Sequence, residues 1–224
     1  MTTAFTDLDG LVDRIPDGAI VAMPQERAGG CAMALVRRAI QRGVRGLRLV
    51  GAQGGGIQVE LLISAGCVDT VDGVDVTSSG FAGMPNAMRT AGNCPVTAAD
   101  ASRSTQIADL AVFHAGKVDR VGNVCISGMR HLRTLTYSAQ SIVVSYEECV
   151  EEDLMADTSG VADTIPAAQV AALAKAPLGS WPLGLSGYYE ADRDHLALYA
   201  KFATTEDGFQ AYLRNHVYQR LAVD

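Results

Sequence analysis

The sequence predicts an α/β protein built on a largely parallel β-sheet, and three observations lead to this class. Short apolar runs alternate with segments of helical periodicity in the first part of the chain. Two later runs, DLAVFHA (109–115) and QSIVVSYE (140–147), are nearly continuous in apolar residues, which is typical of strands covered on both faces. A glycine cluster also separates one predicted strand from the following helix. We therefore expect an α/β sandwich.

The first strand is predicted at AIVAM (19–23), a short apolar segment. The next segment, GGCAMALVRRAIQRG, carries Met33, Val36 and Ile40 at helical spacing, with arginines on the opposite side. Such an amphipathic pattern predicts a helix with one buried face. The order is therefore strand, loop, helix.

The same unit repeats further along the chain. LRLV (47–50) predicts a second strand, and it leads into the glycine cluster. The apolar residues Ile57 and 61–63 then predict a helix that ends at Gly66, a plausible C-terminal cap. Because parallel strands are joined by crossover helices, the repeat favours a parallel sheet.

Three further strands are predicted at VDGVDVTSS (71–79), 109–115 and 140–147. The glutamates of EECVEE, which are Glu147, Glu148, Glu151 and Glu152, predict a helix that begins after the last of these strands. The alternative is that one of them is a nucleophilic or proton-transferring carboxylate, and the helical interpretation is favoured.

Another helix start is predicted at Asp192, Arg193 and Asp194, because acidic residues are favourable at the N-terminus of a helix. A pair of carboxylates that holds an ion is the less favoured alternative.

Composition bounds the function. The 224 residues are 48% hydrophobic, without an apolar run near the roughly 20 residues of a membrane span, so we expect one domain (1–224) and no membrane partner. The first residues show no secretory signal, and the five cysteines form no CxxC pair, which favours reduced thiols and a cytoplasmic location. A formal charge of -7 argues against nucleic-acid binding.

Several familiar motifs are absent. The glycine cluster lacks the lysine of a Walker loop and the spacing of a dinucleotide fingerprint. No GxSxG is present, and the four histidines show no metal-ligand spacing. We therefore predict no metal site and no permanently bound cofactor.

The glycine cluster itself has two interpretations that the local sequence leaves open. Gly54, Gly55 and Gly56 would let a ligand or another segment of backbone approach closely, because glycine has no Cβ. A tight turn that only packs against a neighbouring loop would use the same residues.

Five stretches in order resemble the A (alpha) subunit of the class I CoA-transferases, the group that includes glutaconate and 3-oxoacid CoA-transferases. They are DGAIVAM with the helix ALVRRAIQRG, LRLVGAQGGGIQVELLISAGCVDTV, ADLAVFHAGKVDRVGNVCISG, QSIVVSYEECVEE, and PLGSWPLGLSGYYEADRDHLALY. The third matches a family pattern of a strand ending in His-Ala, followed shortly by Gly-Asn. The resemblance implies a three-layer α/β/α sandwich with the CoA-transferase fold.

Three features depart from the family. The early glycine-rich loop is replaced by MPQERAGG (23–30), and the stretch before ADLAVFHA is shorter than in glutaconate-type subunits. The Glu-(Asn/Ser)-Gly tripeptide that carries the family's nucleophilic glutamate in the B subunit does not occur here. The resemblance therefore implies no catalytic residue in this chain and a partner B subunit, in a heterodimer or a dimer of heterodimers.

The function implied by the resemblance is transfer of CoA between an acyl-CoA and a carboxylate, with the CoA thioester as a substrate. The alternatives are a subunit of a CoA-thioester ring-opening hydrolase of steroid degradation and a non-catalytic stabilising subunit. The implied substrate-binding residues lie in three loops. They are Gln53, Gly54, Gly55, Gly56, Ser78, Ser79, Gly80, Phe81, Gly122 and Asn123.

Overall fold

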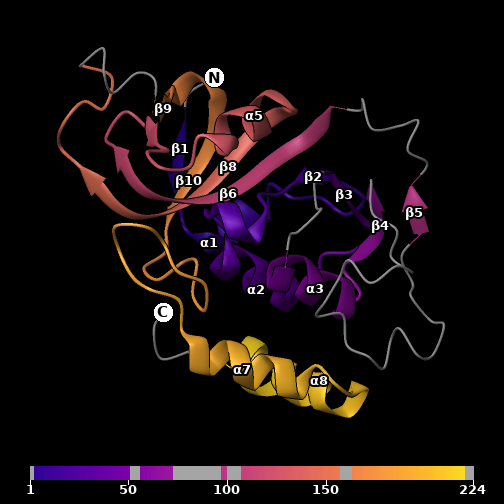
Figure 1. Ribbon diagram of the computed structural model, residues 1–224. Coiled ribbons are helices and arrows are strands. Elements are labelled where there is room, and N and C mark those ends of the chain that lie inside the picture. The colour runs from indigo at the N-terminus through magenta and orange to yellow at the C-terminus, as the bar shows by residue number, and fades with distance from the viewer. Residues whose placement is uncertain (1–2, 51–55, 73–96, 100–106, 157–162, 220–224) are drawn as a thin grey trace.

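The computed structural model describes residues 3–50, 56–72, 97–99, 107–156 and 163–219 (Figure 1). Its centre is a ten-stranded sheet, in which eight strands lie side by side in the order β1-β10-β8-β6-β2-β3-β4-β5. Every neighbouring pair in this row is parallel. Strands β7 and β9 lie off the row, where β7 pairs antiparallel with both β6 and β9. The strands are β1 (Ala4–Thr6), β2 (Ile20–Ala22), β3 (Leu47–Val50), β4 (Val68–Asp72), β5 (Thr97–Ala99), β6 (Ala108–Asp119), β7 (Val124–Cys125), β8 (Ala139–Val150), β9 (Thr164–Ile165) and β10 (Val170–Lys175).

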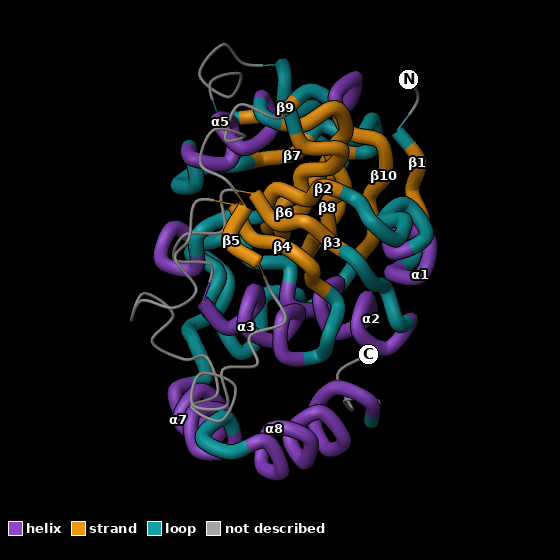
Figure 2. The backbone as a smooth tube through the Cα atoms, turned by 90° about the vertical axis from the view of Figure 1, so that its right-hand side faces the viewer, coloured by secondary structure: helices purple, strands orange, loops and turns teal. Residues whose placement is uncertain are grey.

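Helices cover both faces of the sheet. Figures 1 and 2 show α1, α2 and α3 against one face and α5 against the other, while α7 and α8 form an outer layer beyond α2 and α3. The expected three-layer α/β/α sandwich is confirmed. The helices are α1 (Leu8–Val12), α2 (Met33–Arg42), α3 (Gly56–Ser64), α5 (His131–Tyr137), α7 (Arg193–Phe202) and α8 (Glu206–Tyr212), with 3-10 turns η1 (Glu26–Ala28) and η3 (Ala167–Gln169) and a π-helix η4 (Leu213–Tyr218).

Two hydrophobic cores lie on the two faces of the sheet. The larger core joins the sheet to α1, α2 and α3, and it also takes in Phe209 and Tyr212 of α8. The smaller core lies under α5 and the short strands β7 and β9, and includes Phe113 and Val144. Alternate residues of β6 and β8 thus point into different cores, which explains why both strands are almost continuously apolar.

The strand order reverses between β2 and β6. From β2 the chain proceeds outward through β3, β4 and β5, and then returns to β6 and proceeds the other way. Strand β2 pairs with β6 only at Val21↔Leu110 and Ala22↔Ala111, whereas the β6–β8 ladder continues to Asp119↔Val150. In an open parallel sheet, ligands bind beyond the carboxyl ends of the strands at such a switch point. The site should therefore lie where β2 ends beside β6.

Most predicted elements are confirmed. Strands β2 and β3 and helices α2 and α3 lie at the predicted places, and β6 and β8 are longer than the runs that predicted them. Asp192 is the N-cap of α7, where its carboxylate accepts from the His195 backbone N–H. Of the strand predicted at 71–79, residues 71–72 belong to β4 and the rest lies outside the described residues.

The helix predicted from EECVEE is wrong. Glu147 and Glu148 lie within β8, and Glu151 and Glu152 form the bend after it. The reason is the long parallel partner β6, which continues to pair with β8 through Lys117↔Glu148 and beyond. Tertiary pairing overrides the local preference of glutamate.

None of the helices in the described ranges has the length and apolarity that crossing a membrane requires.

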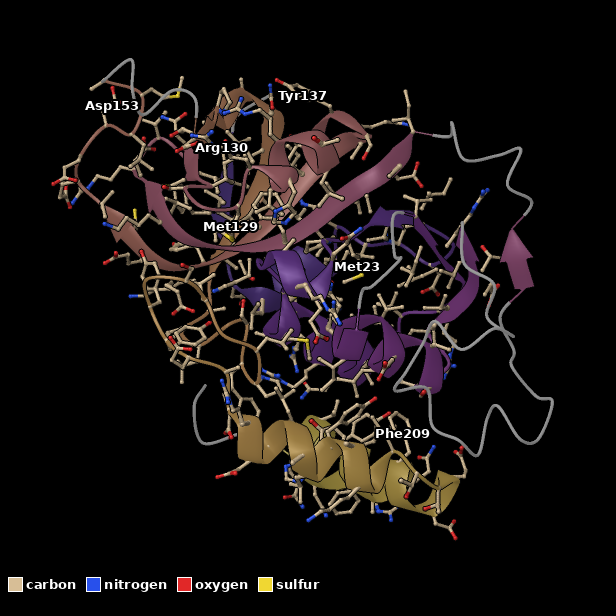
Figure 3. All side chains as sticks on the ribbon, in the orientation of Figure 1. Met23, Met129, Arg130, Tyr137, Asp153 and Phe209 are labelled. Atoms are coloured by element: carbon tan, nitrogen blue, oxygen red, sulfur yellow. The ribbon has the colours of Figure 1, made fainter. Side chains whose placement is uncertain are left out.

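The outer helices share a core with the sheet, and this predicts one cooperative unit. Phe209 of α8, labelled in Figure 3, is 0% exposed in the larger core. Phe209→Ala should cost about 3–5 kcal/mol and lower the melting temperature by roughly 10 °C. Phe5→Ala on β1, where the side chain is 47% exposed, is the control and should shift it far less. A separate early transition for α7 and α8 in calorimetry would contradict the shared core.

Candidate active site

The connection from β2 to α2 (23–32) lies at the switch point. It contains η1 followed by Gly29 and Gly30, which both have a positive φ, of 87° and 79°. The backbone N–H of His114 in β6 donates to the carbonyl of Gly30 at 2.7 Å, so the connection is fastened to the neighbouring strand. A Cβ at Gly30 would lie 3.3 Å from the sulfur of Met129, which Figure 3 labels. Conformation and packing therefore both require glycine there.

Glu26 of η1 reaches across to the start of α3. Its Oε2 accepts a hydrogen bond from the backbone N–H of Ile57 at 2.7 Å. Gly56 has a φ of +57°, and a Cβ added there would lie 1.6 Å from the same oxygen. The last glycine of the cluster thus leaves the space that the Glu26 carboxylate occupies. Gly56 therefore allows the Glu26 side chain, which belongs to the same chain, to approach the backbone closely.

Two buried polar residues of α3 lie behind Glu26. Gln58 is 0% exposed and donates from Nε2 to the Pro24 carbonyl, while its Oε1 has no hydrogen-bond partner among the residues that the structure describes. Glu60 is 6% exposed and accepts from the hydroxyl of Tyr199 at 3.2 Å. Burial raises the pKa of Glu60 to about 7; the Tyr199 hydrogen bond opposes this shift and the nearby charge of Glu26 adds to it.

A second buried cluster, the Glu147 network, lies in the extended part of β6 and β8. Glu147 Oε1 lies 2.8 Å from His114 Nε2, and His114 Nδ1 lies 2.8 Å from Ser145 Oγ. The same oxygen accepts from Tyr189 Oη at 2.7 Å and from the Gly179 N–H, while Oε2 accepts from the Leu178 N–H. One carboxylate therefore joins β6, β8 and the segment at 178–189.

The charged form of Glu147 is the favoured one. Burial alone would raise its pKa, but hydrogen bonds from His114, Tyr189 and the Leu178 backbone outweigh burial and hold the pKa below its ordinary value of 4.5. The Tyr189 hydroxyl has a raised pKa, because it is buried and donates to this carboxylate.

The Glu147 network also fixes the β2–α2 connection. The Gly179 carbonyl accepts from the Ala34 N–H at 2.8 Å, and Ser180 Oγ donates to the Cys31 carbonyl at 2.8 Å. A Cβ at Gly179 would lie 2.3 Å from His114 Cε1. Any side chain at Gly179 would displace the imidazole.

Ser145, His114 and Glu147 are hydrogen-bonded in a row, and they have the residue types of a hydrolase triad without its accessibility. Ser145 and His114 are both 0% exposed, so no substrate can reach the hydroxyl. A nucleophilic serine needs an accessible oxygen and a general base beside it. The network is therefore structural.

The predicted residues Gly122 and Asn123 lie in the turn between β6 and β7. Asp119 accepts from the backbone N–H groups of both and from Asn123 Nδ2, and Asn123 Oδ1 accepts from the Ala167 N–H. β6 continues eight residues past its last pairing with β2, on the order of 25 Å of strand, before it reaches this turn. The structure thus gives the two residues a role in the turn and does not bring them beside Gly56.

The other predicted site residues lie outside the described residues, and their pocket role stays a prediction. They are Gln53, Gly54, Gly55, Ser78, Ser79, Gly80 and Phe81. Within the described ranges, no group of three or more His, Cys, Asp or Glu side chains is arranged to hold a metal ion.

Sequence reasoning did not assign a site role to Glu26, His114 or Ser145, and it gave a catalytic role to Glu147 only as the less favoured alternative. A signal for the last three was present, because polar residues at alternate positions interrupt two otherwise apolar strands. Buried polar side chains must find partners, so they predict a shared network. Glu26 carries no comparable signal.

The Glu147 network predicts a large effect of one conservative change. Glu147→Gln should cost about 3 kcal/mol and lower the melting temperature by roughly 6–12 °C, because either orientation of the amide sets its NH₂ against a donor. Since the folded pKa is lowered, the stabilisation is present above pH 4.5 and is lost as the pH falls through the folded value. Glu148→Gln, half-exposed in the same strand, is the matched control.

Equal melting temperatures for Glu147→Gln and Glu148→Gln at pH 7 would show that the buried carboxylate does not stabilise the fold.

The raised pKa of Glu60 predicts that stability changes with pH in the direction opposite to that predicted for Glu147. Between its ordinary pKa of 4.5 and the folded value of about 7, the folded chain holds more protons at Glu60 than the unfolded chain, so the Glu60 contribution to stability falls as the pH rises through this window. In Glu60→Gln the fall should disappear, with a higher melting temperature than wild type at pH 8. Thermal unfolding of both proteins from pH 5 to 8 measures the difference, and parallel curves would contradict it.

No family model matches the chain. An uncharacterized protein of Archaeoglobus fulgidus is 31% identical over 111 residues, which cover 49% of this chain and 25% of that protein. The A subunit of the 3-oxoadipate CoA-transferase of Pseudomonas knackmussii is 29% identical over 127 residues, which cover 56% of this chain and 44% of the relative. The matched segments thus span less than half of either relative.

Solved structures match over nearly the whole chain. A variant of the decarboxylase AibA/AibB gives a TM-score of 0.76 at 22% identity, and the match covers 96% of this chain and 99% of that one. Glutaconate coenzyme A-transferase of Acidaminococcus fermentans gives a TM-score of 0.79 at 16% identity, with 96% and 89% covered. At these identities the structures show the fold. The chain therefore has the fold of these proteins, and over 127 residues it is similar in sequence to the A subunit of a CoA-transferase.

Proposed function

We propose that this chain is the A subunit of a heteromeric acyl-CoA:carboxylate CoA-transferase whose partner B subunit supplies the nucleophilic glutamate. The observation that carries the proposal is the 29% identity, over 127 residues, to the A subunit of a 3-oxoadipate CoA-transferase. The fold shared with glutaconate coenzyme A-transferase supports the same assignment. The CoA thioester is a substrate here and not a resident cofactor.

The reaction requires a carboxylate of the enzyme. That carboxylate attacks the thioester carbon of the acyl-CoA to give an acyl anhydride and free CoA thiolate, and the thiolate then attacks the enzyme acyl carbon and releases the first carboxylate. The second carboxylate reverses these steps to form the new thioester. Each attack places negative charge on a carbonyl oxygen, which positioned hydrogen-bond donors stabilise.

The hydrogen bonds that engage Glu26, Glu60 and Glu147 support a nucleophile from the partner. Glu26 accepts from the N–H of Ile57, Glu60 is buried against Tyr199, and Glu147 accepts from four groups. A carboxylate that attacks a thioester needs an unengaged oxygen at the surface of the pocket. A partner carboxylate that enters at the β2–β6 switch point would meet this requirement.

The pocket wall in this proposal begins at Gly56 and continues over the predicted residues Gln53, Gly54 and Gly55 and the loop 78–81. Gly122 and Asn123 stay in the proposal as a separate contact at the end of β6. Association with the B subunit, in a heterodimer or a dimer of heterodimers, would close the pocket from the other side.

Decarboxylation is a second candidate. The chain matches one chain of the decarboxylase AibA/AibB over 99% of that chain's length, so the two are of nearly equal extent. Loss of CO₂ from a carboxylated thioester and hydrolysis of a thioester would both use the same pocket. The three reactions differ in their products, which makes them separable in one assay.

The chain alone should exchange no CoA, and the complex with its B subunit should be active. Co-purified complex is incubated with acyl-CoA and a second carboxylate, while new thioester, CO₂ and free CoA thiol are measured in parallel. New thioester without net loss of CoA supports transfer, CO₂ supports decarboxylation, and free thiol supports hydrolysis. In mass spectrometry, the covalent CoA adduct of a transferase should lie on the partner.

An adduct on this chain, or full activity without a partner, would contradict the proposed division of roles. A complex that forms but gives none of the three products would leave this chain with a stabilising role.

A further inference from the structure

Aromatic rings join the outer helices to the rest of the chain in a group that we call the His195 cluster. Its members come from α7, α8, η4 and the segment at 178–189, and they are His195, Tyr212, His216 and Trp181. His195 is 9% exposed, and the centre of its ring lies 4.2 Å from that of Trp181 and 5.0 Å from that of His216. The cluster therefore holds two titratable rings in contact.

The two histidines pack as uncharged rings. Nε2 of His195 lies 2.9 Å from the Tyr212 hydroxyl, and burial raises the pKa of that hydroxyl to about 12, so the tyrosine keeps its proton. Burial lowers the pKa of both histidines below the ordinary value of 6.5, and the charge of His216 lowers the pKa of His195 further. At pH 7 the pair is therefore neutral.

The charged groups beside the pair oppose the uptake of protons. The guanidinium of Arg37 on α2 lies 5.3 Å from the centre of the Trp181 ring, and its charge acts on His195 in the same direction as that of His216. Asp192 acts in the opposite direction, but its two oxygens already accept from the His195 backbone N–H and from Trp181 Nε1. Because like charges repel strongly where little water screens them, two imidazolium rings disfavour this packing.

The ionisable groups one layer further out do not offset the charge. Tyr199 of α7 packs on Tyr212 at 5.0 Å and donates to Glu60, whose raised pKa of about 7 leaves that carboxyl uncharged in mild acid. Arg38 on α2 is a further cation, and Asp9 pairs with it.

Trp181 connects the cluster to the switch point. It directly follows Ser180, whose Oγ donates to the Cys31 carbonyl, and the Gly179 carbonyl accepts from the Ala34 N–H. These two hydrogen bonds hold the β2–α2 connection on the segment at 178–189. A displacement of the indole is therefore transmitted to the connection.

We propose that His195 and His216 form a pH-sensitive switch, in which protonation of the pair displaces Trp181 and loosens the β2–α2 connection. Between the folded pKa values and 6.5 the folded chain holds fewer protons on the pair than the unfolded chain, so the packing is favoured at neutral pH and is lost as the pH falls through this window. The inference concerns this chain alone and does not depend on the proposed function.

Trp181 is the single tryptophan of the chain, so its fluorescence reports on the pair directly. In the full chain the emission should change with a midpoint below pH 6.5, because a protonated imidazole in contact with an indole quenches it. His216→Gln removes the neighbouring charge and should move the midpoint to higher pH. His131→Gln is the matched control, since His131 lies in α5 on the other face of the sheet (Figure 1), and it should leave the midpoint unchanged.

Hydrogen exchange measures whether the change reaches the connection. After correction for the intrinsic rate, protection of the Ala34 N–H should fall about tenfold through the same midpoint, and in His216→Gln this fall should move to higher pH together with the fluorescence. Far-UV circular dichroism should stay constant from pH 7 to pH 5. Constant fluorescence over this range, unchanged protection of Ala34, or loss of helix at the same midpoint would each overturn the switch.

Discussion

The arrangement of the carboxyl edge of the sheet depends on one carboxylate, that of Glu147, whose side chain is only 10% exposed. Glu147 accepts hydrogen bonds from His114 on the adjacent strand, from Tyr189, and from two successive backbone N–H groups at Leu178 and Gly179. Through this one side chain, the segment after β10 is held on β6 and β8, and the β2–α2 connection is held on that segment in turn. A buried charge is tolerated only when every oxygen is paired, and here both are.

Close approach of a side chain to the backbone explains three glycines that are far apart in the sequence. Gly179 leaves room for the His114 ring, Gly116 for the ring of Tyr188, and Gly56 for the Glu26 carboxylate. Each lies where a side chain from a distant part of the chain approaches the backbone closely. The packing here therefore depends on pairs, each made of a glycine and the side chain that lies against it. A Cβ on the glycine would displace that side chain.

The central part of the fold follows from the sequence, because two kinds of periodicity are clear in it. The apolar runs of β2, β3, β6 and β8 and the amphipathic α2 carry enough information to predict the layers and the parallel sheet. The short strands β7 and β9 cannot be predicted in this way, because a strand of two residues is too short to show an alternating pattern. The helix predicted from EECVEE is wrong because glutamates at a strand end and at a helix start give the same local pattern, and only the pairing with β6 distinguishes the two.

The candidate site follows less well from the sequence. Of the loops implied by the family resemblance, the structure describes Gly56 and the Gly122–Asn123 turn, and it separates them along β6. Glu26 comes into contact with α3 through a turn of the chain that no local pattern encodes, because the two residues that meet, Glu26 and Ile57, are 31 positions apart. Contacts of this kind depend on the completed sheet and not on any one segment.

The pairing of β1 with β10 has a consequence for the order of assembly. Ala4 lies opposite Ala172, so β1 is synthesised well before β10, the strand with which it pairs. Until then β1 and the exposed Phe5 have no sheet to join, although β2 and β3 can already pair. Pairings between distant residues are slow to form. We therefore expect the pairing of β1 with β10 at this edge of the sheet to be the last step of folding.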